Sequence, residues 1–168
     1  VPIHIKKIEA DLRDAGLGEK GGVNLSGLID VKSNQMEIQG KIRPFLDKPT
    51  GELRINLPQL NTQSFSNVSF LPNEVDVFLY SRFQISSGIA SQGVINFESA
   101  KSKNEKNSPF SVKINYDLTY DGLKDAVFVN SLNLDLNGLI HTSFAGDVKR
   151  LTKEAIFNIR GEAKTIRL

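Results

Sequence analysis

The chain has 168 residues, which suits one domain, and its 21 basic and 19 acidic residues give a net charge of +2. This balance argues against a dedicated nucleic-acid-binding protein, which would carry a basic excess on one face. Cysteine is absent, so neither a disulfide framework nor a thiolate metal site can form. No apolar run approaches the ~18 residues that a membrane-spanning helix needs.

The first segment, residues 3–12, fits two kinds of structure. Ile5, Ile8 and Leu12 follow helical spacing. A strand would place Ile3 and Ile5 on one face and, after a slip in phase, Ile8 and Ala10 on the same face. We favour the strand, because the rest of the chain shows β patterns and strands tend to pair with their sequence neighbours.

From residue 23 onward, apolar residues recur at every second position in one run after another, with Gly27 and Gly40 keeping the phase. This period of two is typical of strands that bury one face. Turn-forming stretches such as EKGG, FLDKPTG and YDGLKD separate the runs, so the spacing predicts roughly ten strands. The residues predicted to line one apolar groove are Val23, Leu25, Ile29, Ile38, Ile42, Leu53, Ile55, Leu57, Val75, Val77, Leu79, Val112, Ile114, Tyr116, Leu132, Leu134, Leu136, Phe144, Phe157 and Ile159.

A closed sandwich or barrel core would explain the same alternation, but two features favour an open trough. The alternation in residues 110–120 is longer than an ordinary strand needs, and the chain begins and ends within strand patterns, as a piece of a longer array would. We therefore expect an all-β fold with little helix: a long, curled antiparallel sheet that forms an open groove. Residues 1–168 would be a single β-groove segment excised from a longer repeat array.

Patterns associated with phosphate or cation binding are weak in this chain. Gly16, Gly18 and Gly21 match the spacing G-x-G-x-x-G, but Val23 opens a strand, and a dinucleotide site needs a helix there. A hairpin loop explains the glycines better. Residues 117–121 carry an aspartate at each end, yet no calcium-loop spacing surrounds them, so a solvated turn is the better interpretation.

Catalytic patterns are also missing from the sequence. His4 and His141 lack the spacing of zinc ligands, and no G-x-S-x-G motif occurs. The stretch SSGIAS supplies hydroxyls without an adjacent base. We therefore predict no catalytic residue, no metal and no cofactor, and we expect that the protein is not an enzyme; a hydrolase with a dispersed site is the weakest of the alternatives.

The last third of the chain contains a strand pattern L-x-L-x-L-x-G that leads to x-x-F-x-G-x-V-x-x-L, followed by a strand pattern F-x-I-x-G-x-A and x-I. The residues of this arrangement are Leu132, Leu134, Leu136, Gly138, Phe144, Gly146, Val148, Leu151, Phe157, Ile159, Gly161, Ala163 and Ile166. It resembles the repeating segment of the AsmA-like proteins of the Gram-negative envelope, and the stretch RFQISSGIASQGVINFESA also has the style of that family's strands. The resemblance implies a curled sheet of the kind called a β-taco.

The resemblance implies a curled β-sheet in the periplasm that bridges the two membranes and is tethered to the inner membrane through an N-terminal segment that this sequence lacks. It also implies a role in moving phospholipid or in supporting outer-membrane assembly. Its partners would be phospholipid or another acyl lipid, neighbouring β-groove segments of the same chain and an outer-membrane assembly protein.

We therefore expect a non-enzymatic envelope module whose apolar groove passes acyl chains. The alternative is a closed β-sandwich for adhesion or carbohydrate binding. That alternative ranks lower, because carbohydrate sites use exposed aromatic residues and tryptophan is absent.

Overall fold

The computed structural model describes residues 22–31, 34–44, 46–62, 72–99 and 110–165, together with the backbone of residues 3–11. These residues form strands and turns, and no helix longer than a single turn occurs among them. The strands are β1 (Ile3–Asp11), β2 (Val23–Val31), β3 (Asn34–Arg43), β4 (Thr50–Asn61), β5 (Glu74–Ile85), β6 (Ile89–Ser99), β7 (Ser111–Asp121), β8 (Ala126–Leu136), β9 (Ile140–Lys149) and β10 (Ile156–Thr165).

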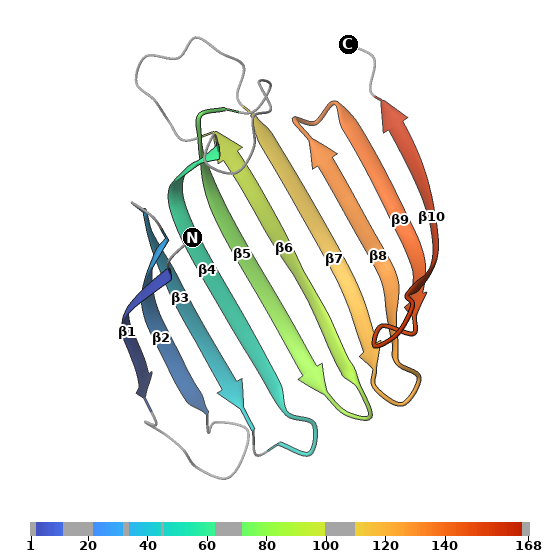
Figure 1. The fold of residues 1–168 in the computed structure, drawn as a ribbon, viewed down its shortest axis with the longest axis horizontal. Helices are drawn as coiled ribbons and strands as arrows, with labels where there is room; N and C mark the ends of the chain where they lie inside the picture. Colours follow the sequence, from blue (N-terminus) through green and yellow to red (C-terminus); the bar gives the residue numbers. More distant parts are fainter. Residues whose placement is uncertain are drawn as a thin grey trace.

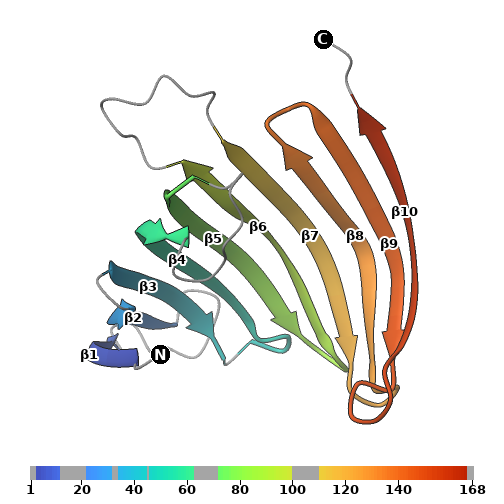
Figure 2. The ribbon, with the colours of Figure 1, turned by 45° about the horizontal axis from the view of Figure 1, so that its top comes forward.

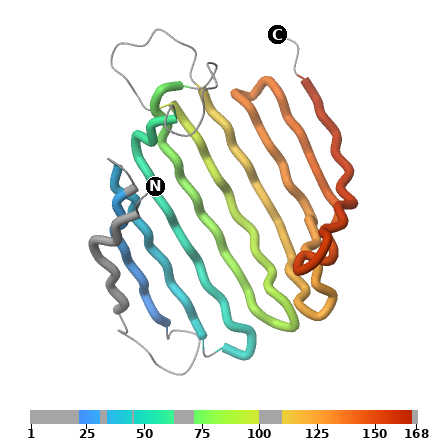
Figure 3. The backbone as a smooth tube through the Cα atoms, viewed as in Figure 1, coloured from blue at the N-terminus to red at the C-terminus, as the bar shows by residue number. Residues whose placement is uncertain are grey.

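All strands belong to one sheet, in which each strand pairs with its sequence neighbours from β1 at one edge to β10 at the other (Figure 1). Every pairing is antiparallel. The chain therefore runs back and forth across the sheet (Figure 3). The direction of the strands changes progressively between β3 and β10, so that the sheet is strongly twisted (Figure 2).

The predicted fold class is confirmed: the described chain is an all-β antiparallel sheet that does not close on itself. The closed β-sandwich alternative does not describe it, because the described strands form one layer. The strand predicted at the start of the chain is also confirmed. In β1 the pairing with β2 skips a residue between Ile5 and Lys7, which is where the alternation slips in phase.

Other breaks in the alternation also coincide with bulges. In β4 the apolar residues Leu57 and Leu60 are three positions apart instead of two, and the pairing with β5 is shifted between them. In β8 the apolar residues Val129 and Leu132 are also three positions apart, and the pairings with both neighbouring strands are shifted there. A bulge places an extra residue in one strand, which restores the phase of the residues that follow it.

Few side chains are deeply buried, as expected of a single layer. Among the described apolar residues only Val75, Ala126 and Val129 count as buried, at 4%, 0% and 8% exposure. No large described side chain is completely buried. Most apolar side chains are half-buried, since they contact their lateral neighbours within the layer and have no second layer above them.

Aromatic rings lie over glycines of neighbouring strands. A Cβ added to Gly51 would lie 2.2 Å from Cζ of Phe83, and one added to Gly161 would lie 2.4 Å from Cδ1 of Phe144. At Gly93 the hydroxyl of Tyr116 would lie at 2.7 Å. Such rings cover the backbone that a glycine leaves bare and help to fix the register of the strands.

The turn between β7 and β8 is organised by Asp121. Its carboxylate accepts hydrogen bonds from the backbone N–H groups of Leu123 and Lys124, at 3.1 and 3.2 Å. The Nζ of Lys124 lies 3.1 Å from the same carboxylate. The hydrogen bond from the Lys124 side chain, aided by the one from its backbone, lowers the pKa of Asp121. The turn predicted at YDGLKD is thus confirmed, whereas residues 117–121 belong to β7, so their interpretation as a solvated turn was wrong.

The close packing at Gly93 gives a test of the sheet. We expect Gly93→Ala to lower the free energy of unfolding by about 2–4 kcal/mol, because the added Cβ would lie 2.2 Å from the backbone oxygen of Tyr80 and the strands would have to separate. The matched control is Gly122→Ala, whose Cβ would have its nearest neighbour at 3.6 Å and which should change stability by less than about 1 kcal/mol. Urea unfolding followed by circular dichroism measures both, and equal stabilities of the two variants would contradict the close approach of the strands at Gly93.

Candidate functional site

The register of the strands places every residue predicted to line the groove on the same face of the sheet. Residues that pair directly in antiparallel strands point to the same side, so the face can be followed from strand to strand. One row crosses the sheet from β3 to β8 through Ile38, Ile55, Leu79, Ile95, Ile114 and Leu134. We call this side the apolar face and the other side the polar face.

The apolar face continues to both outer parts of the described sheet. In β2, Val23 pairs with Ile42 and Ile29 pairs with Met36. In β9 and β10, Val148 pairs with Phe157. The apolar surface is therefore as wide as the sheet, and no described residue outside the strands covers it as a second layer.

Exposure on this face increases toward β10. Phe157 is 70% exposed and Ile159 is 44% exposed, whereas the apolar residues of β7 from Val112 to Leu118 are half-buried. An uncovered apolar surface that spans several strands is a feature that marks interaction sites on soluble proteins. The arrangement is therefore suited to an apolar ligand or partner.

Small residues interrupt the apolar face without making it strongly polar. Ser81 and Ser91 lie in the middle of it, and their hydroxyl oxygens are 3.1 Å apart, so each hydroxyl has a partner. Gly93 lies between Ser81 and Tyr116 in the pairing of β5, β6 and β7. Gly93 leaves room for the ring of Tyr116, and Gly51 on β4 leaves room for the ring of Phe83.

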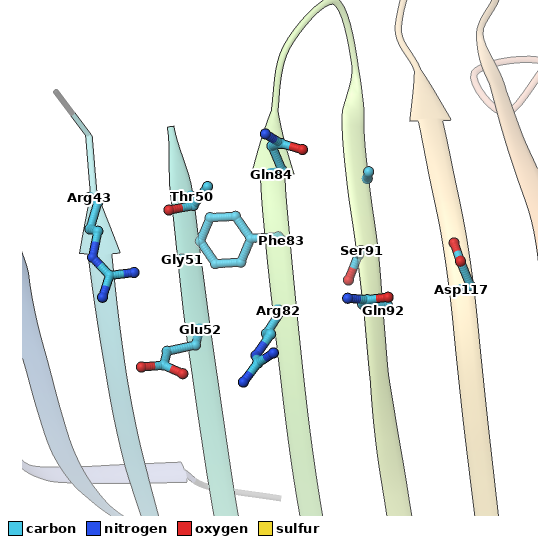
Figure 4. Close-up of a pocket in the computed structure, with 11 residues that line it drawn as sticks. Arg43, Thr50, Gly51, Glu52, Arg82, Phe83, Gln84, Ser91, Gln92 and Asp117 are labelled. Carbon is cyan, nitrogen blue, oxygen red and sulfur yellow. The ribbon is translucent and has the colours of Figure 1, made fainter. Parts of the chain in front are cut away.

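The polar face carries the charged residues and is hollowed near the end of β5. A hollow of about 730 Å³ lies there between β3 and β7, and its charged residues are Arg43, Glu52, Arg82 and Asp117 (Figure 4). Figure 4 also shows the ring of Phe83 reaching from β5 to Gly51 on β4. Two arginines and two carboxylates balance each other in this hollow, which favours neither an anion nor a cation.

A network around Tyr80 joins the charges of the polar face. The guanidinium carbons of Arg54 and Arg82 each lie 5.4 Å from the centre of the Tyr80 ring. The hydroxyl of Tyr80 donates to Glu52 at 3.2 Å and accepts a hydrogen bond from Nε of Arg82. These contacts stabilise the polar face and leave it solvated.

His141 forms a pair that the sequence did not reveal. Its Nδ1 lies 2.7 Å from Oδ2 of Asp135, across β8 and β9 on the polar face. A hollow of about 340 Å³ adjoins the pair, and Ser143 is among the residues that line it. Among the described residues, no hydroxyl forms a hydrogen bond with the other ring nitrogen of His141, so the arrangement lacks an activated nucleophile.

The structure does not support a binding site at the remaining weak motifs. Within the described part of the chain no cluster of three potential metal-ligating side chains occurs. Asp117 instead accepts a hydrogen bond from Asn130 at 2.8 Å. Residues 16–21 and the side chain of His4 lie outside the described residues. No helix in the described ranges is long and apolar enough to cross a membrane.

Comparisons with known proteins add no relative: no family model, no curated protein and no solved structure matches this chain. The resemblance to the AsmA-like proteins therefore stays a prediction. What the structure contributes is the apolar face itself, which we take as the candidate functional site.

Proposed function

We propose that the apolar face binds the acyl chains of lipids and lets them move along the sheet. The observation that carries this proposal is that the strands from β2 to β10 place most of their apolar residues on one face and that no second layer of described residues covers it. A protein that only needed a stable core would bury such a face against its own chain. An acyl chain can take the place of that missing layer.

The energetics favour a ligand of this kind. Burial of each methylene contributes about 0.8 kcal/mol, so a chain of several methylenes gains enough to bind without any polar contact. The apolar face offers no array of hydrogen-bonding groups that would select a particular head group. Binding should therefore be weak and unselective, with the polar head group in water at the border of the sheet.

Passive movement follows from the same surface. Rows such as Ile95, Ile114 and Leu134 give an acyl chain similar contacts at each step across the sheet. No chemical step is needed, and we propose that the protein is not an enzyme. The AsmA-like resemblance suggests the setting: the periplasm, phospholipid as ligand, neighbouring β-groove segments and an outer-membrane assembly partner.

The first test of this proposal uses the two faces of β7. Photo-crosslinking residues placed at positions 112, 114 and 116 should capture lipid, because these positions lie on the apolar face. The same group at positions 113 and 115 should not, since these lie on the polar face. Mass spectrometry of the crosslinked protein measures the capture, and equal capture from both sets would refute the assignment of the lipid to one face.

The second test adds a charge to each face. We expect Ile114→Asp to weaken the binding of a fluorescent fatty acid about tenfold or more, because an acyl chain cannot pass an ion at low cost. The fold should survive with a loss of about 1–3 kcal/mol, since the carboxylate on an open face can still reach water.

The matched control is Asn115→Asp, which adds the same charge on the polar face at an exposed position. It should leave acyl binding unchanged. Fluorescence titration measures binding and urea unfolding measures stability. A folded Ile114→Asp protein that binds the fatty acid as tightly as the parent would show that acyl chains do not cross this face.

A further inference from the structure

The strand β10 forms an open edge of the sheet. It pairs with β9 alone, and Figures 1 and 2 show it at the outer border. All its residues are exposed, including Ile156 at 47% and Phe157 at 70%. None of the described strands pairs with its outward backbone groups, so within the described part of the chain these groups are available for another strand.

This edge has no proline, no bulge and no charge that points into the apolar face, three features that usually prevent strand addition. The segment Ile156–Thr165 contains no proline, and its pairing with β9 runs without a bulge over its whole length. Its charges, on Arg160, Glu162 and Lys164, all lie on the polar face, so no charge points from β10 into the apolar face. The opposite edge differs, because β1 has a shift in register between Ile5 and Lys7.

The order of charges along β10 identifies a fitting partner. The polar face presents a cation at Arg160, an anion at Glu162 and a cation at Lys164. An antiparallel strand with the same sequence, related by a two-fold axis at Gly161, would place its Glu162 opposite Arg160 and its Arg160 opposite Glu162. Opposite charges that face each other across paired strands are stabilising.

We propose that β10 pairs with β10 of a second copy of this chain, antiparallel and centred on Gly161, so that the two sheets become one. On the apolar face Ile159 would then face Ala163 of the second copy, and Phe157 would face its Thr165. Each of these pairs joins a larger and a smaller side chain, which suits close packing between directly opposed positions.

Neighbouring registers are unfavourable. A shift of the pairing by one residue would set apolar positions against polar ones, because alternate residues point to opposite faces. A shift by two residues would place Arg160 opposite Arg160, or Glu162 opposite Glu162. Like charges in directly opposed positions are destabilising. Among these registers the charge order therefore favours the one centred on Gly161, which also pairs more residues of β10 than a register displaced further along the strand.

The symmetry of this pairing closes the assembly at a dimer. A two-fold contact uses the same surface on both copies, so no second β10 edge remains for a third copy. The two apolar faces would continue into each other across the new strand pair. This inference concerns self-association and does not depend on lipid binding.

Charge reversal tests the proposal in the full 168-residue chain. We expect Arg160→Glu and Glu162→Arg each to weaken the dimer about tenfold or more, because like charges then face each other twice across the two-fold axis. The double variant Arg160→Glu with Glu162→Arg should restore the dimer. Lys113→Glu, on the polar face of β7 and far from the edge, should leave it unchanged. Sedimentation velocity measures association, and circular dichroism checks that each variant is folded.

A mixture of the two single variants gives a sharper result. Arg160→Glu chains carry only anions at the two positions and Glu162→Arg chains carry only cations, so the mixture should form heterodimers although each variant alone does not. A folding defect cannot produce this rescue. Because the chain has no cysteine, Asn158→Cys mixed with Lys164→Cys should also form a disulfide-linked dimer, since these two positions face each other in this register.

The parent chain should be a dimer in the concentration range of about 100 μM. A parent that stays monomeric there overturns the proposal, as does a series of larger oligomers, which would mean that β10 pairs with another edge. A dimer that survives both single reversals would also overturn it, because its interface would lie elsewhere on the sheet.

Discussion

The phase of the alternation is the constraint on which this fold depends. In a single layer that is apolar on one side, a slip of one residue turns all the following side chains to the wrong face. The alternation slips within β1, between Leu57 and Leu60 in β4 and between Val129 and Leu132 in β8, and each slip coincides with a shift in pairing. Each bulge thus compensates for a break in the alternation, and the apolar side chains stay on the same face across the sheet.

The sequence predicted the strands and the shared face because both depend on local spacing of apolar residues. It underestimated β6: none of the residues predicted to line the groove comes from this strand, although it runs from Ile89 to Ser99 and places Ile95 on the apolar face. The pattern was hidden there because Ser91 and Gly93 occupy apolar-face positions. The small size of Gly93 is needed by the ring of Tyr116 in the neighbouring strand, which no local pattern can reveal. The pair of Asp135 and His141 was missed for the same reason, since only the register brings them together.

Among the described residues the sheet has no second layer, so this part of the chain must obtain its stability in an unusual way. Ordinary domains bury large side chains completely, whereas here no large described side chain reaches that state. Lateral contacts, such as those of Phe83 with Gly51 and Phe144 with Gly161, and the backbone ladder supply what a core would supply elsewhere. Any apolar ligand that covers the face would then stabilise the folded chain by mass action, because the unfolded chain offers no such face. Stability and ligand occupancy are therefore coupled in this architecture.

The two faces also differ in how they interact with water. Charged residues of both signs lie on the polar face, with Glu52, Arg54 and Arg82 joined through Tyr80, so that this face remains hydrated and resists stacking against another sheet. Apolar association is thereby directed to the other face, and strand addition is directed to the edges. The alternation of apolar and polar residues determines which face each side chain joins. A strand of the same pattern that pairs with the edge in register must therefore continue the apolar surface on one side and the charged surface on the other. Growth of the sheet at its edge thus preserves the division between its faces without requiring a new core.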